Sequence, residues 1–136
     1  MSTNAETDVE FVDFSELKRT DFEALLNAEF AVDLNFLGLS LDGKPLPRAE
    51  AYPSDASVNL KLIEVNPREA LSPATRQDPF ELLFLGSHDT PLFSDVHVMS
   101  HEILGRFCVM LTSVNASPGV NPEQHSEGRF YEAVVG

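Results

Sequence analysis

The chain has 136 residues, and its 22 acidic and 9 basic side chains give a net charge of −13 at pH 7. This length fits one ordinary domain, and the apolar content of 43% is too high for a disordered chain. The negative charge disfavours binding to nucleic acid or to anionic lipid, and no run approaches the roughly 20 apolar residues that span a bilayer, so we expect no membrane insertion.

Residues 1–16 are expected to form an acidic arm ahead of a single domain at 17–136. The arm lacks the features of a signal peptide, so we expect cytoplasmic synthesis, with incorporation into a larger or exported assembly left open. It has no Lys or Arg, yet it contains strong strand formers, which a solvated tail does not need. These are Val9, Phe11, Val12 and Phe14. Either the arm packs on its own domain or it adds a strand to another subunit, and we assign these four residues to partner binding.

One helix is well signalled. Thr20 and Glu23 have the spacing of a capping box, in which the Thr20 hydroxyl and the Glu23 carboxylate each bind the other residue's amide. Phe22, Leu25 and Leu26 then share one helix face, which is expected to cover one end of the fold.

The next segments alternate between apolar and polar residues. Residues 30–36 predict one half-buried strand, and residues 58–65 predict another. The apolar phase of the second strand shifts between Leu62 and Ile63, as in a β-bulge. Asn66 and Pro67 are expected to begin a single helical turn. Two long connections, 38–57 and 66–79, are either surface loops that tolerate insertion or contacts with a partner.

The carboxy-terminal half supplies the remaining strands. Residues 80–85 are apolar on both faces, which is typical of a covered central strand. Segments 96–100 and 106–114 flank a short connection and predict an antiparallel hairpin, and 130–135 predict a last strand. The sequence therefore predicts an all-β fold with one or two short helices, a small antiparallel barrel or sandwich of about six to seven strands.

Four histidines invite a metal hypothesis: His88, His97, His101 and His125. On one extended strand, His97 and His101 would lie about 13 Å apart, too far to share an ion. No Cys pair or metal-binding helix motif accompanies them, because Cys108 is the only cysteine. We therefore expect no metal and no cofactor.

No arrangement of catalytic residues stands out either. Ser87-His88-Asp89 and Ser100-His101-Glu102 contain nucleophile, base and acid, but adjacency in sequence does not aim side chains at one another. Neither segment has the glycines of a nucleophile elbow. Cys108 lies in an apolar strand, where a thiol usually behaves as a small hydrophobe. We expect no catalytic residues and a protein that is not an enzyme.

The carboxy-terminal half also carries four recognisable segments: Pro79–Ser87, Thr90–Phe93, Met99–Gly105 and Glu127–Val134. In this order they resemble a bacterial family of small all-β domains of unknown function, over roughly residues 17–136. The resemblance implies an all-β fold without assigned catalytic residues, found beside phage-tail-collar or fibre-type proteins. The matched residues also have structural interpretations: Gly105 supplies the positive φ of a tight turn, and His101 bonds across that turn.

These observations favour a non-enzymatic structural or protein-binding module. Its partner would be copies of itself or a fibre-type or tail-type protein. One alternative is a barrel that binds a small ligand at its mouth. Another is an acidic chaperone or immunity-like protein that faces a basic partner.

Overall fold

The structure is a computed structural model, and it describes residues 11–48, 53, 56–68, 79–87, 91–114 and 128–135. Two short helical segments come first: the 3-10 turn η2 (Phe14–Glu16) and the helix α1 (Arg19–Glu23). The strands in chain order are β1 (Glu29–Asp33), β2 (Phe36–Leu39), β3 (Pro45–Pro47), β4 (Ser57–Pro67), β5 (Phe80–Ser87), β6 (Asp95–His101), β7 (Gly105–Val114) and β8 (Gly128–Val135).

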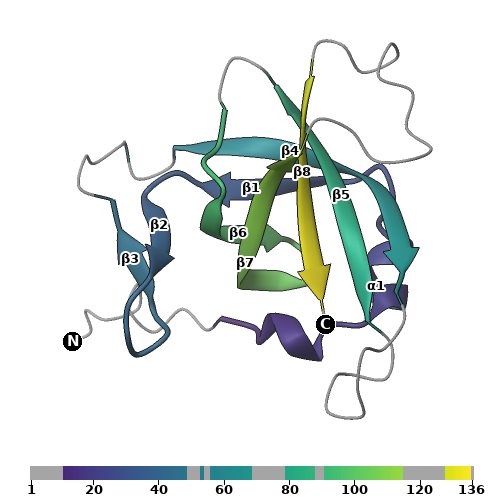
Figure 1. Ribbon diagram of the computed structural model, residues 1–136, viewed down its shortest axis with the longest axis horizontal. Coiled ribbons are helices and arrows are strands. Elements are labelled where there is room, and N and C mark those ends of the chain that lie inside the picture. The colour runs from purple at the N-terminus through teal and green to yellow at the C-terminus, as the bar shows by residue number, and fades with distance from the viewer. Residues whose placement is uncertain are drawn as a thin grey trace.

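Six of these strands close into an antiparallel barrel in the order β1-β4-β5-β8-β7-β6, and β2 and β3 form a separate two-stranded sheet beside it (Figure 1). The alternation along each strand sends one set of side chains inward, as in Phe30 and Val32 of β1. This confirms the predicted all-β class, and of the two architectures considered the barrel is the one observed. The hairpin of β6 and β7 is also confirmed, with His101 paired to Gly105.

Aromatic side chains fill the interior and one end of the barrel. The rings of Phe30 and Phe84 meet edge to face at 5.5 Å inside it. At the end, α1 inserts Phe22, whose ring centroid lies 5.8 Å from that of Phe80 and 6.3 Å from that of Phe107. Phe22 therefore covers this end as predicted. The helix ends at Glu23, however, so Leu25 and Leu26 lie beyond it and do not share its face. Leu25 packs against the core, and Leu26 is exposed.

The N-terminal segment packs on its own barrel from Val12 onward. The Val12 amide donates a hydrogen bond to the Arg106 carbonyl at 2.7 Å, and the Phe14 ring stacks on Phe107 at 5.2 Å. β7 pairs with β8 only at Thr112–Val114, so the earlier part of β7 diverges from β8. The segment lies against this diverging part, along the lower end of the barrel in Figure 1.

The helix begins two residues earlier than predicted. The prediction of Thr20 as its cap is wrong, because the residue before the first helical position is Lys18. The Lys18 amide donates to the Asp21 carboxylate at 2.8 Å. An acid three residues after the cap therefore binds the cap amide, as in the expected motif, but that acid is Asp21 and not Glu23.

Two of the predicted strand boundaries are wrong. The strand at 30–36 ends at Asp33, whose carboxylate accepts a hydrogen bond from the Asn35 amide at 2.9 Å and turns the chain toward β2. The helical turn at Asn66 is replaced by the end of β4, where Pro67 pairs with Phe80. A proline is tolerated at that position because the strand ends there.

The β-bulge predicted in the second strand is confirmed, because the register of β4 against β5 shifts between Leu62 and Glu64. The predicted central strand at 80–85 extends to Ser87, and Gly86 lies buried within it. A Cβ atom there would come within 2.6 Å of Leu60 and 3.3 Å of the Tyr131 ring. The glycine therefore leaves room for Tyr131, whose hydroxyl accepts a hydrogen bond from the Leu92 amide at 2.9 Å.

The contacts of Phe14 predict that the N-terminal segment stabilises the barrel. Phe14→Ala is expected to lower the free energy of unfolding by about 2–4 kcal/mol, because it leaves a cavity beside Phe107 and Phe22. Phe11→Ala is the matched control, with an expected loss below about 1 kcal/mol, because Phe11 is 40% exposed and contacts the Arg106 guanidinium. Urea denaturation measures both, and equal losses would contradict the assignment.

Candidate functional site

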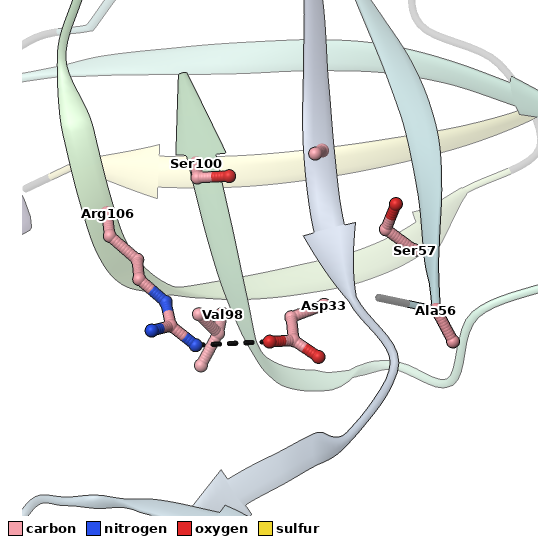
Figure 2. Close-up of a pocket in the computed structure, with 7 residues that line it drawn as sticks. Asp33, Ala56, Ser57, Val98, Ser100 and Arg106 are labelled. Carbon is pink, nitrogen blue, oxygen red and sulfur yellow. Dashed lines mark hydrogen bonds and ion pairs between the residues drawn. The ribbon is translucent and has the colours of Figure 1, made fainter. Parts of the chain in front are cut away.

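A hollowed polar surface lies over the outer face of β1. Two adjoining cavities, of about 370 and 340 Å³, share Ala31 and Ser100 in their walls. We call their union the β1 trough. Figure 2 shows one of the two, with Ser57 and Ser100 on opposite sides and Asp33 facing Arg106 at one end.

The strand register explains why this surface is hollow. Ala31 pairs with Asn59 of β4 on one side and with Ser100 of β6 on the other. Asp33, two residues along, pairs with Ser57 and Val98. Side chains at paired positions stand on the same face, so short side chains cover this part of the barrel, with Ala31 as the floor.

Arg106 closes one end of the trough and is firmly held. Its guanidinium donates to the Asp33 carboxylate at 3.1 Å, and both side chains are about a quarter exposed. The same guanidinium lies over the ring of Phe11 at 5.1 Å and over that of Phe36 at 5.6 Å. The two rings and the carboxylate hold the guanidinium in one position, so this end of the trough is rigid. The charges of Arg106 and Asp33 also cancel, so this end is electrically neutral.

The opposite end of the trough is acidic. Glu29 and Glu102 line it together with His101. The Asn59 amide donates to the Glu29 carboxylate at 3.4 Å. Within the described ranges, no Lys or Arg lies within ion-pair distance of Glu29 or Glu102. Lys61 pairs with Glu29 across β1 and β4 and stands on the same outward face, so two carboxylates against one ammonium leave one net negative charge at this end.

A second exposed feature is apolar and lies on the two-stranded sheet. The hairpin of β2 and β3 projects from the side of the barrel (Figure 1). Leu41 at its turn is fully exposed, and Leu39 and Leu46 are each about two-fifths exposed. At its base, the Arg48 guanidinium lies 5.8 Å from the ring of Phe93, which is 62% exposed. We call the four exposed residues, Leu39, Leu41, Leu46 and Phe93, the hairpin patch.

The residues assigned to partner binding lie in different environments. Val9 lies outside the described residues. Val12 and Phe14 contact their own barrel, and Phe11 covers the guanidinium of Arg106. The structure therefore brings three of the four beside β7, and partner binding by them stays a prediction.

The two residues assigned to a structural turn lie together between β6 and β7. Gly105 has a φ of +91°, a conformation that favours glycine. The His101 Nδ1 atom accepts a hydrogen bond from the Ile103 amide at 3.0 Å, and its ring lies 4.8 Å from that of Phe30.

The other chemistry-bearing residues do not converge. His88 and His125 lie outside the described residues, and within the described part no three His, Cys, Asp or Glu side chains come together to hold a metal. Burial raises the pKa of the Cys108 thiol, which keeps it protonated and unreactive, although Arg106 acts in the opposite direction. No helix in the described ranges is long and apolar enough to cross a membrane.

His97 is a buried residue of β6, only 2% exposed, and its Nε2 atom is 2.7 Å from the Phe93 carbonyl. A carbonyl accepts, so Nε2 carries the proton of the neutral ring. Burial lowers the pKa of His97 below 6.5, and Arg48 acts in the same direction. The Phe93 carbonyl and Asp95 partly oppose this shift.

This pKa shift predicts a loss of stability in mild acid. Well above pH 6.5 the ring is neutral in both the folded and the unfolded state, so it adds no pH dependence there. Below that pH the unfolded chain binds the proton more readily, and the free energy of unfolding falls until the folded-state pKa is passed. Denaturation between pH 7.5 and 5 is expected to show a shallower slope for His97→Gln than for the wild type. A wild-type slope for His97→Gln would contradict the prediction.

Comparison with known proteins gives one match. The family model described as a domain of unknown function, DUF6916, matches residues 48–135, which include β4 to β8 but not β1 to β3. No curated protein and no solved structure matches the chain significantly. The resemblance to small domains of unknown function is thus confirmed at that level. The chain belongs to the DUF6916 family.

Proposed function

We propose that the chain is a non-enzymatic protein-binding module that assembles through its β2–β3 hairpin. The observation that carries this proposal is the exposure of the hairpin patch, because large apolar side chains left in water on and beside a projecting element mark interaction sites. Covering Leu41 and Phe93 alone would remove most of two large apolar side chains from water, which is favourable.

The hairpin favours contact through side chains over strand addition. Lys44 and Arg48 flank β3 and direct their backbone groups toward the residues that flank β2. The Lys44 carbonyl accepts from the Ser40 amide, and the Arg48 amide donates to the Asn35 carbonyl. Alternation therefore directs the nitrogens of Pro45 and Pro47 to the open edge, where they have no proton to donate. An added strand would find few donors there, so a partner would bind to Leu39, Leu41 and Leu46 instead.

The partner in this proposal is a second copy or a fibre-type or tail-type protein. The resemblance of the carboxy-terminal segments to bacterial domains found beside such proteins supports it. The chain would be made in the cytoplasm and built into a larger or exported assembly. A ligand inside the barrel is a weaker alternative, because rings such as those of Phe30, Phe84 and Tyr131 occupy the interior. The second candidate function is that of an acidic chaperone or immunity-like protein that binds a basic protein, and the net charge of −13 supports it.

Sedimentation velocity tests the proposal. The wild type is expected to gain mass with concentration, and Leu41→Ser/Phe93→Ser is expected to stay monomeric with wild-type stability. Ile103→Ser/Met110→Ser is the matched control, because it also removes two exposed apolar side chains but leaves the hairpin unchanged. Equal loss of association in both double variants would contradict a role for the hairpin, and a wild type that stays monomeric would exclude self-assembly.

A further inference from the structure

The β1 trough is a second surface, separate from the hairpin patch, and its shape fits an elongated ligand. The trough runs along β1 from Glu29 to Asp33. These residues are four positions apart, so on an extended strand the trough is about 13 Å long. Its sides are the outward side chains of β4 and β6, and its floor is Ala31. An extended peptide of five residues spans the same length.

The chemistry of the trough fits a basic ligand at one end. Glu29 and Glu102 provide two carboxylates, and the ammonium of Lys61, which pairs with Glu29 across β1 and β4, offsets only one of them and forms no ion pair with either. The net charge of the chain adds a long-range attraction for cations. A lysine ammonium or arginine guanidinium would therefore be drawn to this end, and a phosphate or carboxylate would be repelled.

The middle and the far end add polar contacts without charge. Ser57, Asn59 and Ser100 offer hydroxyl and amide groups along the walls. At the far end, Arg106 and Asp33 neutralise each other, and the two rings hold the guanidinium in place. The backbone of β1 is already paired on both sides, so a ligand cannot join the sheet and must bind through side chains.

We propose that the β1 trough binds an extended segment of a partner protein that carries a lysine or arginine, with the basic side chain between Glu29 and Glu102. The segment lies along β1 and its backbone and small side chains rest over Ala31. This site does not depend on the hairpin patch. A chain that fails to self-assemble can therefore still bind the segment, and a chain that does not bind the segment can still self-assemble.

The test is an NMR titration of the full-length, ¹⁵N-labelled chain with the capped peptide acetyl-Lys-Ala-Lys-Ala-Lys-amide at low salt. The expected result is a set of saturable shift changes confined to amides around the trough, namely those of Glu29, Ala31, Asn59, Ser100 and Glu102. Shift changes spread over all acidic faces of the barrel, or no changes at all, would overturn the proposal.

Three variants separate the trough from general attraction to an acidic protein. Glu29→Gln/Glu102→Gln is expected to weaken binding about tenfold, since it removes two exposed charge contacts. Glu16→Gln/Glu23→Gln removes the same charge from the helical end and should change the affinity less than about twofold. Ala31→Leu keeps every charge but fills the floor of the trough, and it should abolish binding while its spectrum shows an intact fold.

Two further results would overturn the proposal. One is equal weakening by the two glutamine pairs, which would show attraction by net charge alone. The other is wild-type affinity in Ala31→Leu, which would show that the trough is not occupied. Spermidine is titrated in parallel as a cation without a peptide backbone. Weaker binding of spermidine supports a peptide site, and binding as tight as the peptide's at the same amides would overturn it in favour of a site for free amines.

Discussion

Closure of the barrel depends on one short strand. β1 has only five residues, yet it pairs with β4 on one side and β6 on the other, and without it these two strands would be open edges. Its inward side chains, Phe30 and Val32, are fully buried, while its outward side chains are small or charged. The same five residues therefore close the core and form the floor of the trough.

Arg106 connects parts of the chain that are distant in sequence. Its side chain on β7 reaches the end of β1 through Asp33, the hairpin through Phe36 and the N-terminal segment through Phe11. Its carbonyl binds the amide of Val12. Arg106 therefore helps to fix the hairpin relative to the trough, together with the packing of β2 and β3 against β6, so a partner large enough to cover both would meet a surface of fixed geometry.

Sequence patterns predicted the all-β class and most of the barrel strands, but they left barrel and sandwich as alternatives and did not reveal the features of the surface. Alternation identified the strands, and the phase shift after Leu62 located the bulge, because both depend on which face is buried. The start of the helix was predicted wrongly because Asp21 binds the Lys18 amide and places the cap at Lys18 instead of Thr20. The turn at Asn66 was predicted wrongly because Asn66 and Pro67 pair with the beginning of β5. The pair of Asp33 and Arg106 joins residues 73 positions apart, and no local pattern signals such a contact. No sequence pattern marks Ala31 either, because it becomes the floor of the trough only when β4 and β6 lie beside β1.

The order of strands in the barrel also constrains how the chain folds. β1 and β6 must pair across more than sixty intervening residues. The N-terminal segment can pack on the barrel only after β7 has formed, because the Val12 amide binds the Arg106 carbonyl of β7. Contacts between distant parts of a chain form slowly, because the entropy of closing a long loop is lost first. During synthesis, Phe14, Phe22 and Phe30 leave the ribosome well before the strands that bury them. The nascent chain therefore presents three phenylalanines to the cellular environment for the time that translation of β6 and β7 requires.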